Sequence, residues 1–165
     1  MTESGGADFD LFDITRRDLA ELCRLSHEYF AELVPYDGTL LFIDNWDKRY
    51  GRLMQLGLDS DRFFIRGARI GEQIVGFIMF GYRVEELWEV ANRGYISNIY
   101  VAPSWRRKGI GRRMVLDAIE TLKASGSSLI ELEVYERNEA GTKFWAQFGF
   151  QPFKFRRRLM LDDTL

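Results

Sequence analysis

The sequence predicts an α/β fold in which a mixed, mostly antiparallel sheet carries helices on both faces. Two observations support this prediction. Gly71-Glu72 separates two apolar runs, which is typical of an antiparallel hairpin with a tight turn. Further along the chain a strand, a helix and a strand follow one another, and this order indicates a parallel pair of strands. We therefore expect a parallel pair beside the hairpin in one sheet.

Length and composition indicate a single folded domain. The chain has 165 residues, which is enough for one substantial core, and 46% of them are hydrophobic. The first ten residues are polar and lack the basic and apolar regions of a signal peptide. We therefore expect a flexible segment over residues 1–10 and one domain over residues 11–165.

Charge and cysteine content limit the partners that we expect. No apolar run approaches the roughly 18 residues of a membrane span. Cys23 is the only cysteine, which excludes an internal disulfide and a Cys-rich metal site. The net charge of -2 argues against a dedicated nucleic-acid-binding protein. We expect a cytoplasmic protein without a metal or a membrane partner, and a homodimer is one assembly that these properties leave open.

Apolar residues that recur every three or four positions predict four helices. Thr15 or Asp13 would cap the first helix with a side-chain oxygen, and Gly126 and Gly149 suit the ends of the last two. The predicted helices cover residues 15–33, 43–56, 110–126 and 140–148.

Strands are predicted where β-branched and aromatic residues cluster or alternate with polar ones. The chain contains four such runs before its last helix, and its tail should return to the sheet as one or two strands. The predicted strands cover residues 63–70, 73–83, 95–101 and 129–135, with the tail at 151–161.

The stretch from Arg106 to Gly111 places two glycines and several cations where a helix begins. The first N–H groups of a helix have no partner inside it, and the helix dipole is positive at that end. Gly109 and Gly111 would let the main chain approach an anion closely. The stretch therefore predicts a phosphate or diphosphate site, with a solvated basic loop as the alternative.

Two common phosphate motifs do not fit this stretch. Met114 stands where the dinucleotide fingerprint has its third glycine. The Walker pattern of Gly, four residues and Gly-Lys-Ser/Thr is absent from the sequence. The site therefore needs another explanation.

The spacing around Gly109 resembles the Gln/Arg-x-x-Gly-x-Gly/Ala signature of the GNAT superfamily of N-acetyltransferases. Residues 134–150 (VYERNEAGTKFWAQFGF) are similar to the next motif of that family, a strand, an Asn, a helix and a terminal Gly-Phe. The run GEQIVGFIMF also resembles its central strands, so the resemblance covers residues 63–150. It implies acetyl-CoA as co-substrate and direct transfer of the acetyl group to a primary amine of a small molecule or peptide.

The resemblance also implies which residues bind acetyl-CoA. The diphosphate would lie on the N–H groups of Arg107 to Arg112, with Lys108 or Arg112 near the ribose phosphate. The pantetheine arm would pair with the main chain of Ile99 and Val101 like an added strand. Asn138 would bind the arm or a nearby loop, although an Asn before a helix is also an ordinary cap. The full set is Ile99, Tyr100, Val101, Arg106, Arg107, Lys108, Gly109, Ile110, Gly111, Arg112 and Asn138.

The implied reaction needs a hydrogen-bond donor for the oxyanion, and the departing thiolate gains from a proton donor. A free N–H near Tyr100 would serve the oxyanion. The family often has a Tyr proton donor where this chain has Trp145, whose indole cannot give up a proton. Either the thiolate leaves unaided, or Tyr135 or Tyr95 replaces the missing donor. We expect Trp145 to be a wall of the arm's tunnel or part of the core.

No side chain stands out as the general base. Strict alternation would place Tyr95, Ser97, Ile99 and Val101 on one face of their strand, where Ser97 would hold a water. The catalytic candidates are therefore Tyr95, Ser97 and Tyr135. We expect His27, the single histidine, to be an ordinary surface or packed residue.

Aromatic and acidic residues of the first two predicted helices and their connection suit a cationic amine acceptor. These residues are Tyr29, Tyr36, Asp37, Asp44 and Trp46. Two other functions stay open at this point. One is a non-catalytic acyl-CoA-binding module, suggested by Trp145 and the missing base. The other is a nucleic-acid-associated protein that uses its arginine clusters, which the net charge disfavours.

Overall fold

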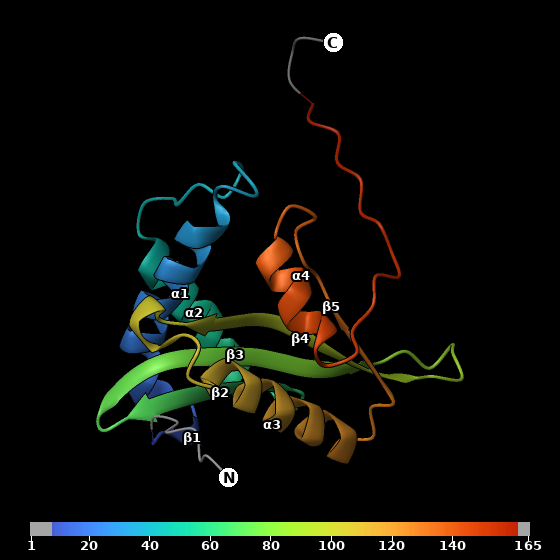
Figure 1. Cartoon of the computed structure of the whole chain (residues 1–165), viewed down its shortest axis with the longest axis horizontal. Helices are drawn as coiled ribbons and strands as arrows, with labels where there is room; N and C mark the ends of the chain where they lie inside the picture. The colour runs from blue at the N-terminus through green and yellow to red at the C-terminus, as the bar shows by residue number, and fades with distance from the viewer. Residues whose placement is uncertain (1–7, 162–165) are drawn as a thin grey trace. The chain divides into compact units, whose positions relative to one another are not determined.

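The computed structural model describes residues 8–161, which divide into one compact unit up to Glu133 and a second from Val134 on. The first unit holds a five-stranded sheet in the order β1-β2-β3-β4-β5 (Figure 1). β1 to β4 pair antiparallel and β5 runs parallel to β4, which confirms the predicted mixed sheet. The strands are β1 (Asp10–Asp13), β2 (Phe63–Ile70), β3 (Gln73–Val84), β4 (Asn92–Val101) and β5 (Leu129–Leu132).

Three α-helices of this unit pack on the sheet, close to where the periodicity predicts them. They are α1 (Leu19–Leu33), α2 (Trp46–Leu58) and α3 (Ile110–Ala124). A short turn, η1 (Arg16–Asp18), precedes α1, and Thr15 rather than Asp13 caps it by accepting from the Arg17 N–H. A second such turn, η2 (Pro103–Trp105), lies between β4 and α3.

The helices cover both faces of the sheet, as predicted. On one face, Leu22 and Leu25 of α1 are fully buried in a cluster with Phe77 and Met79 of β3. On the other face, a side chain added at Gly94 of β4 would meet Leu122 of α3 at 3.1 Å. The buried side chains of α3 are Ile110, Met114, Val115, Ala118 and Leu122, which form the apolar stripe of its sequence.

An extra residue in β4 makes one sequence-based prediction wrong. Met79 pairs with Asn98 and Phe80 with Ile96, so Ser97 has no partner in β3. Such a bulge reverses the faces of all residues after it. Tyr95 therefore does not share a face with Ile99 and Val101, although strict alternation predicts that it does.

β5 is shorter than the predicted strand 129–135, and its ladder with β4 ends directly before the bulge. The parallel ladder begins at Arg93 and Leu129 and ends at Ile96 and Leu132. Beyond these pairs β4 continues to Val101 along β3, whereas β5 has ended. In the first unit, this leaves the last part of β4 paired on one side only.

The sequence does not reveal β1, which begins at Asp10, within the segment predicted to be flexible. Leu11 and Phe12 of this strand pair with Ala68 and Gly67 of β2. A four-residue strand carries too little periodicity to be recognised, and its partner lies far along the chain. The remainder of the predicted flexible segment, residues 1–7, lies outside the described residues.

The second unit contains one helix, α4 (Glu139–Ala146), which the sequence predicts as residues 140–148. The prediction of one or two strands over residues 151–161 is wrong, since none of these residues lies in a helix or strand. Alternation alone does not make a strand, because strands require a hydrogen-bonded neighbour. Among residues 8–161, no helix has the length and apolarity to cross a bilayer.

The contact of α1 with the sheet should dominate the stability of the first unit. Leu22 is 0% exposed and Leu53 of α2 is 59% exposed. We expect Leu22→Ala to lower the free energy of unfolding by about 2–5 kcal/mol, because it leaves a cavity. The same exchange at Leu53 should change it by less than about 0.5 kcal/mol. Urea unfolding followed by circular dichroism measures both, and equal losses would contradict this description of the core.

Candidate functional site

Within the first unit, the last part of β4 has no strand partner on the side away from β3. The N–H of Ala102 donates to the carbonyl of Val75 in β3 at 2.8 Å. Because main-chain groups alternate sides along a strand, those of Ile99 and Val101 point away from β3. The ladder to β5 has already ended at Ile96. These residues are therefore placed to pair with an extended ligand, and they provide the free N–H groups near Tyr100.

The start of α3, a few residues after the end of β4, brings several main-chain N–H donors together. Gly109 precedes the helix with φ of 85°, and Arg107 has φ of 64°. The first α-helical hydrogen bond across this start runs from the Arg113 N–H to the Gly109 carbonyl at 3.0 Å. The N–H groups at Ile110 and Gly111 therefore lie where a helix has no internal acceptors. Among the described residues, apart from its neighbours in the chain, no atom lies within 4 Å of the position that a Cβ would take at Gly109, so its surroundings are open.

The cations around this start do not have equivalent surroundings. Lys108 lies 4.3 Å above the ring of Trp105, which holds its ammonium group beside the loop. Arg107 and Arg112 are exposed. Arg106 is bound elsewhere, by Val101 and by Glu32 of α1. An anion at the helix start would thus meet main-chain donors, the helix dipole and local positive charge.

Ser97 and Tyr95, two of the catalytic candidates, both have partners inside the first unit. The hydroxyl of Ser97 donates to the carbonyl of Met79 at 3.2 Å. The hydroxyl of Tyr95 lies next to Gly81 of β3, where an added Cβ would meet it at 2.7 Å. Burial raises the pKa of Tyr95, and the nearby guanidinium of Arg83 acts in the opposite direction. Their catalytic roles stay predictions.

Asn138, Trp145 and Tyr135 belong to the second unit. The side chain of Asn138 accepts from the Gly141 N–H at 2.8 Å and so caps α4. Trp145 packs edge-on against Phe144 and Phe150, with ring centroids 5.0 and 5.5 Å away. These contacts agree with a packing role for Trp145. The cofactor role of Asn138 and the catalytic role of Tyr135 stay predictions.

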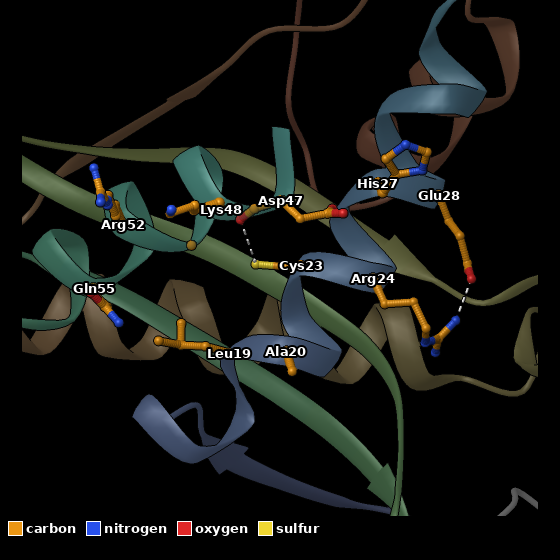
Figure 2. A pocket seen from close by; sticks show the side chains of 11 residues that line it. Leu19, Ala20, Cys23, Arg24, His27, Glu28, Asp47, Lys48, Arg52 and Gln55 are labelled. Atoms are coloured by element: carbon orange, nitrogen blue, oxygen red, sulfur yellow. Dashed lines mark hydrogen bonds and ion pairs between the residues drawn. The ribbon is translucent and has the colours of Figure 1, made fainter. Parts of the chain in front are cut away.

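A broad groove of about 900 Å³ lies between α1 and α2 (Figure 2). Figure 2 shows the thiol of Cys23 of α1 directed at Asp47 of α2, whereas Glu28 is turned toward Arg24 on its own helix. The ring of His27 stacks on Phe42 at 4.0 Å, so this histidine is packed as well as exposed. Burial raises the pKa of the Cys23 thiol, which keeps it protonated and unsuited to nucleophilic attack. The groove therefore offers no nucleophile, and its charged lining combines the carboxylates of Glu28 and Asp47 with the basic side chains of Arg24, Lys48 and Arg52.

Several residues expected at the acceptor site serve the structure instead. Asp37 accepts from the N–H and hydroxyl of Thr39, which fixes the turn after α1. Trp46 stacks on Tyr50 at 4.5 Å and contacts the ring of His27. Burial raises the pKa of the Tyr29 hydroxyl, and the side chain of Asn98 of β4 acts in the opposite direction. The contacts of Asp37 and Trp46 stabilise the connection between the two helices.

Sequence reasoning missed two glutamates of α1, Glu28 and Glu32. Glu28 accepts from the buried hydroxyl of Tyr100 at 3.1 Å, and Glu32 binds Arg106. They lie one helical turn apart, which places them on one face of α1. That spacing was visible in the sequence, but their partners lie 72 and 74 residues away.

Comparison with known proteins decides the family. The model of the family described as "Acetyltransferase (GNAT) family" matches residues 19–150, which include the open edge of β4 and the start of α3. The chain belongs to this family. It is therefore an acyl-CoA-dependent N-acetyltransferase by class, and acetyl-CoA is its implied co-substrate. Among residues 8–161, no group of three His, Cys, Asp or Glu is placed to hold a metal ion.

Individual relatives of this acetyltransferase are distant. It is 28% identical to N-alpha-acetyltransferase 30 of Schizosaccharomyces pombe over 148 residues, 88% of this chain and 86% of the relative. It is 26% identical to an uncharacterized N-acetyltransferase of Methanocaldococcus jannaschii over 143 residues, 87% of this chain but 61% of the relative. The structure of ribosomal-protein-alanine N-acetyltransferase from Brucella melitensis has the same fold, with a TM-score of 0.71 and 21% identity, over 93% of this chain and 99% of that one.

Gly109 provides a direct test of the coenzyme site. A side chain at its φ of 85° is strained, so Gly109→Val should shift the main-chain donors of the acetyltransferase. We expect CoA affinity to fall at least tenfold, or about 1.4 kcal/mol, because hydrogen bonds to a charged group are lost. Isothermal titration calorimetry with CoA measures this effect.

Gly71 is the matched control, since it also has positive φ (58°) and open space around it, in the turn between β2 and β3. Gly71→Val should cost similar stability and leave CoA affinity unchanged. Equal affinity of both variants for CoA would exclude the start of α3 as the diphosphate site.

Proposed function

We propose that this acetyltransferase moves an acetyl group from acetyl-CoA directly to a primary amine of a small molecule or peptide. One observation carries the proposal. The unpaired edge of β4 at Ile99 and Val101 leads, through a short turn, to the glycine start of α3. An elongated ligand with an extended arm and a diphosphate would find main-chain donors along both parts.

The first unit offers groups that bind acetyl-CoA and stabilise the oxyanion, whereas the proton of the amine goes to water. Collapse of the oxyanion breaks the thioester C–S bond and releases CoA as its thiolate. The N–H groups at the start of α3 hold the diphosphate, with Lys108 and Arg112 close to the nucleotide. The main chain of Ile99 and Val101 aligns the arm, so that the thioester carbonyl lies beside the edge of β4. A free N–H of that edge then stabilises the oxyanion formed when the amine attacks. Acetyl-CoA supplies an activated thioester, and no covalent acyl-enzyme is required.

The acceptor is a cationic amine that loses its proton before it attacks. Carboxylates of Glu28 and Asp47 line the groove between α1 and α2, but so do Arg24, Lys48 and Arg52, and Glu28 is already paired with Arg24. The groove is therefore a candidate for the acceptor that shows no charge preference of its own. Relatives differ in acceptor, since one is a spermidine N(1)-acetyltransferase and another an N-alpha-acetyltransferase. Both classes of acceptor carry a primary amine at an accessible chain end.

The activity and the acceptor class can be tested together. Acetyl-CoA is incubated with spermidine, an aminoglycoside, lysine and short peptides, and free thiol release is followed. We expect at least one amine to accelerate release. With a peptide acceptor the rate should level off above pH ~8, and with an alkylamine it should keep rising toward pH ~10, because only the neutral amine attacks.

The competing function is a non-catalytic acyl-CoA-binding module, which the indole of Trp145 in place of the usual Tyr favours. Tight CoA binding without acceleration by any amine would support that function and contradict catalysis. Absence of CoA binding would contradict both.

A further inference from the structure

The side chain of Arg106 is directed toward α1 and β4. Its Nε donates to the carbonyl of Val101 at 2.7 Å. Its Nη2 donates to both carboxylate oxygens of Glu32, at 2.6 and 2.8 Å. The guanidinium also lies 5.4 Å from the centre of the Tyr100 ring. Its planar fork is thus engaged with a carbonyl, a carboxylate and an aromatic face at once.

The hydroxyl of Tyr100 lies beside both Glu28 and Glu32 of α1. Tyr100 is only 4% exposed. Its hydroxyl donates to Glu28 at 3.1 Å and lies 3.4 Å from Glu32. Burial raises the pKa of this hydroxyl, and the adjacent carboxylates raise it further, so that it remains a donor. Tyr100 of β4 and Arg106 of the following loop are therefore both bonded to one face of α1.

The Val101 carbonyl points to the edge where an added strand would pair. Because Arg106 already donates to it, a ligand arm that pairs with β4 has the N–H of Val101 and both groups of Ile99 available, and its pairing ends there. Arg106 is also the residue directly before Arg107, where the chain turns with positive φ toward the helix start. Its position therefore fixes both the end of the edge and the beginning of the loop.

We infer that Arg106 and Glu32 form a clamp that positions the coenzyme loop, and that the guanidinium of Arg106 serves Val101 and Glu32 rather than a phosphate group. The inference rests on the proposed function for the identity of the ligand. It makes both residues positioning residues, and it gives α1, which lines the acceptor groove, a direct connection to the coenzyme side.

The clamp and a phosphate-binding Arg106 predict opposite effects of Glu32→Gln. If Arg106 bound phosphate, removal of the Glu32 charge would release the guanidinium and strengthen the binding of an anion. If the clamp positions the loop, the same exchange weakens binding. Arg106→Lys keeps the positive charge but cannot bridge Val101 and Glu32 together, so the clamp predicts weaker binding here as well.

Glu21→Gln is the matched control, because Glu21 is also on α1 and paired with an arginine, Arg24, at 2.6 Å. Its side chain is 36% exposed, against 45% for Glu32. CoA affinity is measured by calorimetry for the full chain and for the three variants. We expect Glu32→Gln and Arg106→Lys each to weaken CoA binding about two- to fivefold, the range of a partly exposed ion pair. Glu21→Gln should bind as the unchanged chain does.

A second measurement tests the clamp without any ligand. Hydrogen exchange of the peptide that covers residues 101–111 is followed by mass spectrometry in the ligand-free protein. We expect faster exchange in Glu32→Gln and Arg106→Lys than in Glu21→Gln, with unchanged exchange in β2 as evidence of intact folding.

The outcomes separate the inference from the proposed function. Unchanged or tighter CoA binding in Glu32→Gln, or unchanged exchange of residues 101–111, overturns the clamp even if CoA binds well. An unchanged chain that binds no CoA contradicts the proposed function, and the exchange measurement then decides on the clamp alone.

Discussion

The extra residue at Ser97 is the constraint on which the rest of the first unit depends. It lets Gly94 face α3 while Tyr100, later in the same strand, reaches α1. In a regular strand these two residues would share a face, since both have even positions. The bulge also coincides with the end of the ladder to β5, and the hydroxyl of Ser97 is bonded to the facing carbonyl of Met79. A buried central strand thereby acquires an edge that can accept a ligand.

In the proposed site, main-chain groups make most of the contacts with the coenzyme. This explains why only a few positions of the sequence indicate the site. A site made of N–H groups constrains side chains only where they would obstruct the main chain, as at Gly109. Its other requirements concern direction and register, which many sequences satisfy. Members of the acetyltransferase family can therefore keep this site although their sequences are only 26–28% identical to this chain. The residues that align such a site, Arg106 and Glu32 here, lie beside it and need not contact the ligand.

The helices and the central strands could be predicted from the sequence because their signals are local. Periodic apolar residues indicate α1 and α3, and the Gly71 turn indicates the hairpin of β2 and β3. The bulge at Ser97 has no such signal, since one additional polar residue in β4 does not distinguish a bulged strand from a regular one. The strand β1 and the pair of Glu32 and Arg106 depend on partners far along the chain, and the tail alternates without a partner. Local pattern therefore predicted the elements and the glycine site, but neither the register nor the links between elements.

The chain has Trp145 where the family often has a Tyr proton donor, and this exchange is consistent with catalysis. The reason is that the two proton transfers of the reaction differ in how much they need a side chain. The departing thiolate has a pKa near ~8.5, so it leaves at neutral pH without prior protonation more readily than an alkoxide. The attacking amine is the more basic partner, with a pKa of ~8 for a chain terminus and ~10.4 for an alkylamine. Loss of its proton to water is therefore the step for which a side chain matters most. In the proposed reaction the edge of β4 stabilises the oxyanion, and the groove between α1 and α2, which acidic and basic side chains both line, is the candidate site of the acceptor. Selection of the acceptor and stabilisation of the transition state thus belong to different parts of the first unit, and the clamp joins them.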